Sequence, residues 1–88
     1  MKRQVAVALR YDLDRDLAPR VAAKGWGETA RRILEIARAH DVPVKRDDDL
    51  AQVLAKLELG AGIPEKLYRA VAGVLAFVYQ LNGRRGGA

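Results

Sequence analysis

The short apolar stretch at residues 5–11 constrains the fold of this chain more than any other feature. Its larger side chains stand at Val5, Val7, Leu9 and Tyr11, and alanines occupy positions 6 and 8. This pattern is typical of a β-strand that other parts of a domain cover on both faces. Because 88 residues give room for only one core, the stretch predicts a central strand in a single small domain.

Two more strands are predicted by the residues that follow. Residues 12–19 are polar and end in a proline, so they predict a connecting loop, and residues 20–24 predict a second strand. The triplet Gly25-Trp26-Gly27 should end that strand. Residues 41–46 predict a third short strand, which Pro43 places at an edge because proline has no backbone N–H.

Three helices are predicted by apolar residues at helical spacing. Residues 28–40 carry them at positions 30, 33, 34 and 37. The acids at 47–49 predict the start of a second helix of about three turns. Pro64 suits the first turn of a third helix, which Asn82-Gly83 should end. One residue central to each apolar face is expected in the core: Leu34, Leu54 and Val74.

The resulting order of elements, β, β, α, β, α, α, predicts an α/β fold. We expect a small mixed β-sheet of about three to four strands packed with three main helices, with a right-handed crossover around residues 20–46. Residues 1–83 should form the domain, and residues 84–88 a flexible basic tail.

The composition removes most classes of enzyme. The chain has no cysteine and no serine, one threonine and one histidine, so neither a Ser-His-Asp triad nor a Cys-His pair can be built. A transition-metal site usually needs several histidine or cysteine ligands. We therefore predict no catalytic residues, no metal and no cofactor.

Charge suggests binding to a partner. The net charge is +5, and residues 1–46 hold eleven Lys or Arg against six Asp or Glu. The candidate partner-binding residues are Arg10, Arg15, Arg20, Lys24 and Trp26. The cations are equally consistent with a solvated surface, and Trp26 either is an exposed aromatic anchor or packs at the start of the first helix. Nucleic acid is disfavoured, because acids alternate with the arginines and no aromatic stacking platform is visible.

Short segments through nearly the whole chain resemble a known family. They are Ala-Val-Ala-Leu-Arg-Tyr-Asp at 6–12, Ala-Pro-Arg-Val at 18–21, Ala-Lys-Gly at 23–25, Ile-Leu-Glu-Ile-Ala at 33–37, Val-Pro-Val at 42–44, Asp-Leu-Ala at 49–51, Ile-Pro-Glu-Lys-Leu-Tyr at 63–68, Ala-Val-Ala at 70–72 and Val-Tyr at 78–79. In this order the segments identify residues 5–81 as similar to the C-terminal cytoplasmic domain of the FlhB/YscU family, the export-apparatus switch proteins of flagella and injectisomes.

In that family the domain follows a transmembrane portion and cleaves itself between Asn and Pro of an Asn-Pro-Thr-His motif just before the first strand. Residues 1–4 occupy this place here, and the only asparagine is Asn82, so the sequence holds no Asn-Pro bond. The resemblance therefore implies a non-enzymatic, stand-alone protein that is similar to the cleaved C-terminal fragment and lacks both self-cleavage and membrane anchor.

The function implied by the resemblance is that of an interaction module of the flagellar type III protein export apparatus. Such a module would substitute for the fragment of the substrate-specificity switch protein or compete with it. Its expected partners are export-gate proteins and export substrates or chaperones. We expect a cytoplasmic location, with recruitment to the inner face of the membrane at the export apparatus. The alternative is a small basic domain that binds nucleic acid or another anionic surface.

The resemblance also implies an open strand position. In the family a strand from the membrane-side fragment lies in the same sheet, so the edge at Val5, Val7 and Leu9 should be available for strand addition. The membrane-side fragment of a full-length FlhB-type protein, or a second copy in a homodimer, would supply the strand.

Overall fold

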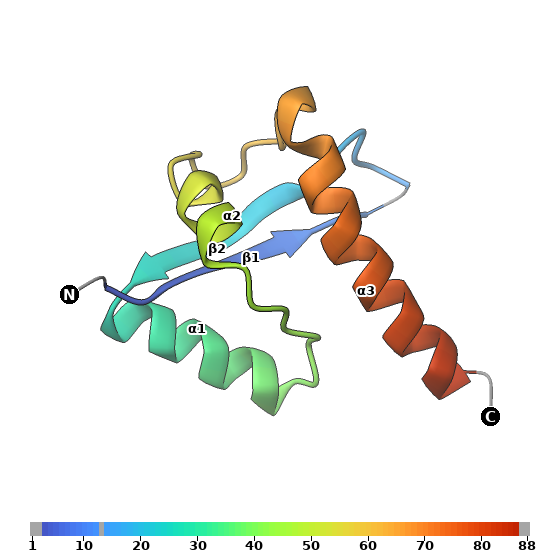
Figure 1. Ribbon diagram of the computed structural model, residues 1–88, viewed down its shortest axis with the longest axis horizontal. Helices are drawn as coiled ribbons and strands as arrows, with labels where there is room; N and C mark the ends of the chain where they lie inside the picture. The colour runs from blue at the N-terminus through green and yellow to red at the C-terminus, as the bar shows by residue number, and fades with distance from the viewer. Residues whose placement is uncertain (1–2, 13, 87–88) are drawn as a thin grey trace.

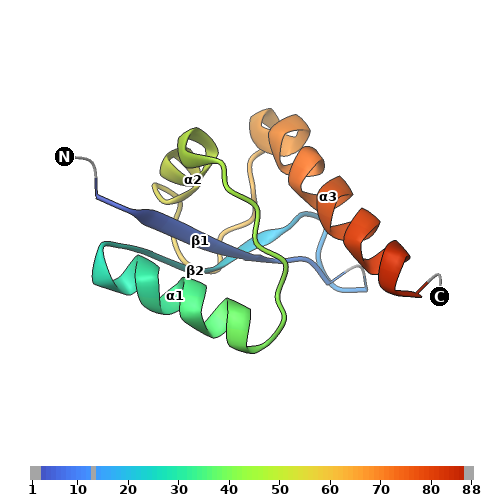
Figure 2. The ribbon, with the colours of Figure 1, turned by 60° about the horizontal axis from the view of Figure 1, so that its bottom comes forward.

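The chain folds into a two-stranded sheet with helices on both faces. The computed structural model describes residues 3–12 and 14–86. In chain order the elements are β1 (Val5–Arg10), β2 (Arg20–Trp26), α1 (Glu28–Ala39), α2 (Asp48–Leu54), the single-turn 3₁₀ helix η1 (Glu65–Leu67) and α3 (Tyr68–Gly86). Helix α1 covers one face of the sheet, while α2 and α3 lie on the other (Figures 1 and 2). The predicted α/β class and the three main helices are confirmed.

The two strands form an antiparallel pair with one β-bulge. Val5 lies opposite Trp26 and Arg10 opposite Arg20, and the register shifts between Ala8 and Leu9. The outer edge of β2 is covered by an irregular segment rather than by a strand. Here the Val21 N–H donates to the Ala61 carbonyl at 3.0 Å, and the Ile63 N–H donates to the Pro19 carbonyl at 2.9 Å. The sheet therefore contains two strands in the described residues.

The prediction of a third strand, and with it a mixed sheet of three to four strands and a crossover at 20–46, is wrong. Residues 41–46 begin with the end of α1, because the Val42 N–H donates to the Ala37 carbonyl at 2.8 Å and the Asp41 N–H to the Arg38 carbonyl at 3.3 Å. Asp41 takes the left-handed φ of 56° that this type of helix end requires. With the Val42 donor used there and Pro43 lacking one, too few donors remain for a ladder.

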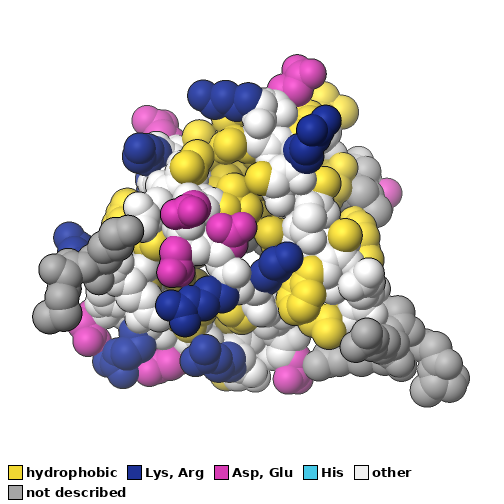
Figure 3. Space-filling view, in the orientation of Figure 1, with side chains coloured by type: hydrophobic (Ala, Val, Ile, Leu, Met, Phe, Trp, Pro, Cys, Tyr) yellow, Lys and Arg dark blue, Asp and Glu magenta, His cyan; other side chains and the backbone are white. Residues whose placement is uncertain are grey.

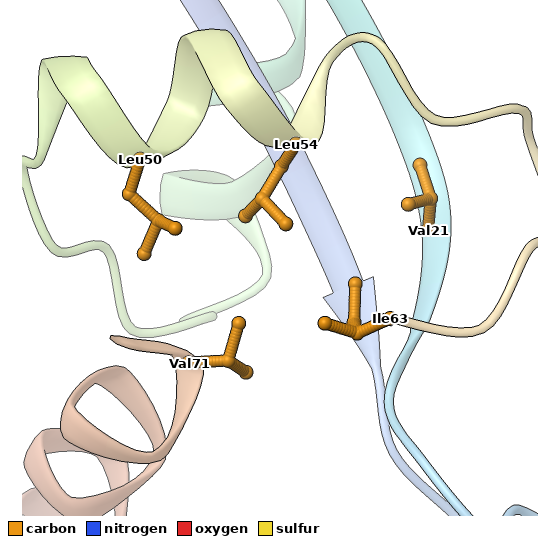
Figure 4. Close-up of a cluster of buried hydrophobic side chains, with 5 residues drawn as sticks. All are labelled: Val21, Leu50, Leu54, Ile63 and Val71. Carbon is orange, nitrogen blue, oxygen red and sulfur yellow. The ribbon is translucent and has the colours of Figure 1, made fainter. Parts of the chain in front are cut away.

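The main core lies between the sheet and the α2–α3 layer. Five buried side chains point toward one another there (Figure 4): Val21, Leu50, Leu54, Ile63 and Val71. Leu54 and Val74 were predicted as core residues; Leu54 is buried, and Val74 packs against this cluster while partly exposed. The core is shallow, because hydrophobic side chains also reach the surface between α2 and the start of α3 (Figure 3).

The face covered by α1 is built from small residues. Ala6 and Ala30 are buried, and a Cβ on Gly25 would collide with the side chain of Thr29 in the first turn of α1. Leu34, predicted as the core residue of this helix, is only half-buried. Because the helix approaches the strands so closely at Gly25, alanine and glycine fill the contact that the pattern assigned to a leucine.

The last two helices differ from prediction at their ends. Asp47 caps α2, since its carboxylate accepts from the Leu50 N–H at 3.1 Å, but the helix has seven residues and ends after Leu54. Helix α3 continues through the predicted end at Asn82-Gly83 to Gly86. Arginine is a good helix former, so positions 84 and 85 extend the helix. The predicted tail at 84–88 therefore overlaps α3, and its last two residues lie outside the described part.

Candidate partner-binding site

An apolar groove forms where the connection between the two strands meets α3. Its lining, here called the loop–helix groove, consists of Tyr11, Leu17, Ala18, Pro19, Tyr68, Val71, Ala72 and Leu75, and it encloses about 150 Å³. The four α3 residues recur at intervals of three and four, so they share one face of that helix. Leu17 is 100% exposed, although it is a large aliphatic residue. The groove can accept an apolar side chain of another molecule.

The wall of the groove that carries Leu17 is held by a closed turn. The Asp12 carbonyl accepts from the N–H groups of Arg15, at 3.1 Å, and Asp16, at 2.7 Å. In return, the Asp12 N–H donates to the carboxylate of Asp16 at 3.1 Å. These bonds fix the chain just before Leu17, and the hydrogen bond from Ile63 to the Pro19 carbonyl fixes it just after. Leu17 therefore lies in a loop whose backbone is held by hydrogen bonds on both sides of it.

Asp16 is the acid that pairs with two arginines at this end of the molecule. Its side chain is 5% exposed, and Arg20 Nε donates to it at 3.0 Å while Arg10 Nε lies 3.9 Å away. The hydrogen bond from the Asp12 backbone lowers the pKa of Asp16 below 3.8, and the two arginines act in the same direction against burial, which raises it. Arg20 also donates to the Gly60 carbonyl at 2.8 Å, so it ties the loop to the segment along β2.

The predicted cations do not form one basic surface. Arg10 and Arg20 meet at Asp16, and Arg15 Nε lies 3.9 Å from Asp12 in the same loop. Lys24 is half-buried on the α2 side, where its Nζ donates to the carbonyls of Ala55 at 3.0 Å and Leu57 at 2.6 Å. It therefore satisfies carbonyls just after α2 and supports the fold.

Trp26 lies at the opposite end of the sheet. It lines a second, shallow depression, here called the tryptophan hollow, together with Arg3, Val5, Gln52 and Lys56. Its side chain is 40% exposed, so neither of the two expectations, an exposed anchor or a fully packed residue, describes it alone. The sequence pattern did not predict the loop–helix groove, because its four α3 residues have the spacing of a helix face that packs in a core. Leu17, an apolar residue inside a polar loop, was the available signal.

The predicted edge is unpaired in the described residues. The Gln4 carbonyl accepts from the Gly27 N–H at 2.8 Å, so the backbone groups of Gln4 face the β2 side. Along an antiparallel strand, the backbone N–H and C=O groups of successive residues face alternately toward and away from the neighbouring strand. The backbone groups of Val5, Val7 and Leu9 therefore face away from β2. No backbone hydrogen bond reaches them from other described residues outside the ladder. The connection from α1 to α2 passes in front of β1 in both ribbon views without pairing with it (Figures 1 and 2).

Neither a metal-binding cluster nor a membrane-spanning helix is found among the described residues. Within 3–12 and 14–86, no three His, Asp or Glu side chains are grouped to hold a metal ion. Among these same residues, no helix is both long and apolar enough to cross a bilayer.

Comparisons with known proteins assign the family. Residues 3–78 match the profile of the "FlhB HrpN YscU SpaS Family". The chain is 42% identical to YlqH, an uncharacterised protein of Bacillus subtilis, over 88% of this chain and 83% of YlqH. It is 49% identical to the flagellar biosynthetic protein FlhB of Salmonella typhimurium over 88% of this chain and 20% of FlhB, so it spans about a fifth of that relative.

The fold agrees with the sequence match. The cytoplasmic domain of FlhB from Shewanella putrefaciens superposes with a TM-score of 0.87 at 40% identity, covering 94% of this chain and 65% of that one. The match therefore extends over the sheet and all three helices. The chain belongs to the FlhB HrpN YscU SpaS family, the switch proteins of flagellar and type III protein export.

Proposed function

We propose that this chain is an interaction module of the flagellar type III protein export apparatus, and that it binds an apolar segment of a partner protein in the loop–helix groove. The observation that carries the proposal is the fully exposed Leu17 beside an apolar groove, in a chain of the export-switch family. A braced apolar wall is suited to recognition, because little ordering cost remains when a partner binds.

Binding is favoured over catalysis by the groove itself. Its lining holds no carboxylate, histidine or lysine, and its only polar side-chain groups are the hydroxyls of Tyr11 and Tyr68. Among the predicted cations, Arg15 stands two residues before Leu17 and is exposed, so we assign it to the rim of the groove. Arg10 contributes more weakly there, while Arg20 and Lys24 act through the fold.

The likeness to FlhB leads to a more specific role. We propose that the chain substitutes for the C-terminal fragment of a full-length switch protein or competes with it, on the cytoplasmic side of the export apparatus. Export-gate proteins, export substrates and their chaperones are the proposed partners. The open edge of β1, at Val5, Val7 and Leu9, would then receive a strand from the membrane-side part of an FlhB-type protein or from a second copy.

The groove is tested by a matched pair of substitutions in α3. Ala72 lines the groove, Ala76 does not, and both are exposed. The tagged chain is used to capture the flagellar export proteins of its own organism. Ala72→Glu should abolish capture because it places a charge in the groove, and Ala76→Glu should retain it. Equal capture by both variants, or no capture of any export protein by the parent, would contradict the proposal.

The edge is tested by backbone amide exchange. A peptide spanning the strand before the cleavage motif of a full-length FlhB-type protein is added to saturation. The amides of Val5 and Val7 should exchange more slowly with the peptide, whereas those of Ala6 and Ala8, which face β2, should change little. Unchanged exchange at Val5 and Val7 would exclude strand addition and leave the groove proposal intact.

A further inference from the structure

The tryptophan hollow combines an apolar floor with a cationic rim. Three separate parts of the chain form it: Arg3 and Val5 at the start of β1, Trp26 at the end of β2, and Gln52 and Lys56 in α2 and the turn after it. Its volume is about 300 Å³, and it lies where β1 begins and β2 ends, at the far end of the sheet from the loop–helix groove (Figure 1).

The floor comes from one cross-strand pair. Val5 lies opposite Trp26 in the ladder, so both side chains project from the same face of the sheet, toward α2. Gln52 of α2 and Lys56, in the turn just after that helix, form the opposite wall. Trp26 keeps 40% of its surface exposed, which leaves part of an indole ring available for contact. Tryptophan is the residue type that most often dominates a protein interface.

The rim carries two cations that form no ion pair with other described residues. Arg3 and Lys56 are exposed, and neither forms an ion pair with another described residue. By contrast, Arg10, Arg20 and Arg31 each pair with an acid of the chain. The nearest acids on α2 lie in its first turn, and Asp48 there pairs with Arg46 at 3.6 Å. Two uncommitted cations beside an exposed indole complement a ligand that is both acidic and apolar.

We propose that the tryptophan hollow docks an acidic peptide segment of a partner protein. One apolar side chain of the segment contacts Trp26 and Val5, and acidic residues on either side of it lie against Arg3 and Lys56. The Gln52 amide is placed to bond the backbone of the segment. This site is separate from the loop–helix groove, and the inference does not depend on the export role.

The test uses the fact that Trp26 is the only tryptophan, so its emission reports on the hollow alone. The full chain is titrated with the capped peptide Glu-Glu-Phe-Glu-Glu, with its glycine-centred analogue and with Lys-Lys-Phe-Lys-Lys. The acidic phenylalanine peptide should change the emission saturably and lose affinity as salt is added. The glycine analogue should bind at least about tenfold more weakly, and the basic peptide should not bind.

Charge reversal locates the site. Lys56→Glu and Arg3→Glu should each weaken the acidic peptide about tenfold or more, because like charges then face each other. Lys66→Glu is the matched control, since Lys66 is exposed on η1 and lies outside the hollow. Unfolding midpoints and far-ultraviolet circular dichroism check that the variants fold. Calorimetry with Trp26→Ala should show the same loss of affinity without relying on fluorescence.

Several outcomes would overturn the inference. These are no saturable response to the acidic phenylalanine peptide, an equal response to the basic peptide, or equal weakening by Lys66→Glu. A single-stranded oligonucleotide of the same net charge serves as a competitor. If it binds the hollow as tightly as the peptide does, the surface is a general anion site and the peptide proposal fails.

Discussion

The two ends of the β1–β2 hairpin expose opposite kinds of surface. At the connecting-loop end, Arg10 and Arg20 pair with the buried carboxylate of Asp16, and the fully exposed, aliphatic Leu17 stands beside an apolar groove. At the other end, the aromatic Trp26 is 40% exposed, and the cations Arg3 and Lys56 beside it form no ion pair with another described residue. The loop end therefore offers a partner an aliphatic surface whose neighbouring charges are paired, and the tryptophan end offers an aromatic surface beside unpaired cations.

The contrast shows that a cation in the sequence is not always free to bind a partner, because an acid of the same chain can already pair with it. The first half of the chain is strongly basic, yet most of its arginines are paired with nearby acids. Net charge alone would place a binding surface around Arg10, Arg15 and Arg20. At the tryptophan end, by contrast, Arg3 and Lys56 form no ion pair with another described residue.

The largest effect is expected from Leu54→Ala, which tests whether the two ends share one core. Leu54 is buried in the main cluster, so its truncation should cost about 2–5 kcal/mol of unfolding free energy. Denaturant unfolding followed by Trp26 emission and by circular dichroism should give one common transition. Leu59→Ala is the control, because Leu59 is exposed and should change stability by about 0.5 kcal/mol or less. Two separate transitions would mean that the ends fold independently.

Gly25→Ala should have the next largest effect, and it acts at the tryptophan end. The new methyl group would collide with Thr29, so α1 must shift at a cost of about 1–3 kcal/mol. Gly62→Ala is the control, because a Cβ there meets no atom within 4 Å. Partial recovery in the Gly25→Ala/Thr29→Ala variant would tie the cost to this contact. Equal unfolding midpoints for the two glycine variants would refute it.

Asp16→Asn tests the loop end through pH. The folded-state pKa of Asp16 lies below its ordinary value of 3.8, so the ionised carboxylate stabilises the fold above pH 3.8, and this contribution is lost as pH falls below it. The variant should unfold at lower denaturant than the parent at neutral pH, and the difference should shrink as the solution is acidified below pH 3.8. Asp14→Asn, at an exposed position of the same loop, should match the parent at neutral pH. A difference that stays constant with pH would contradict this assignment.

The smallest effect is expected at the start of the chain, which should remain chemically intact. Self-cleavage of the family type needs an asparagine amide that attacks its own carbonyl before a proline, and this sequence contains no Asn-Pro bond. Intact-mass measurement after prolonged incubation at neutral to mildly alkaline pH should show one unchanged species. A discrete cut within the first ten residues would show that the tryptophan end is reactive, and the comparison of the two ends would need revision.

The elements that could be predicted from the sequence are those fixed by local pattern. The helix expected at 28–40 runs from Glu28 to Ala39, and the first two strands lie within two residues of their predicted bounds. The third strand could not be predicted correctly, because the left-handed turn at Asp41 depends on where α1 stops. The short α2 likewise depends on contacts with β2 that are distant in sequence.

The sequence shows which types of residue the candidate sites contain, but not which side chains the fold pairs or brings together. The sequence predicts Arg10, Arg20 and Lys24 as partner-binding cations, but only the folded chain brings Asp16 to the arginines and two carbonyls to Lys24. Trp26 stands out in the sequence because glycines flank it. Arg3 and Lys56, which line the same hollow, are distant from it in the sequence. Such groupings depend on tertiary contacts, which periodicity does not encode.

The hydrogen bonds from Lys24 to the end of α2 have a consequence for the order of folding. A helix of seven residues is far below the ~12–15 needed for an isolated helix in water, so α2 cannot form early by itself. The carbonyls of Ala55 and Leu57, just after the helix, accept from Lys24 of β2, more than thirty residues earlier in the chain, so they gain this donor only when α2 docks against the sheet. Helix α2 should therefore dock late, and substitutions there should speed unfolding more than they slow folding. The lifetime of the native state then depends on how long this seven-residue helix stays docked.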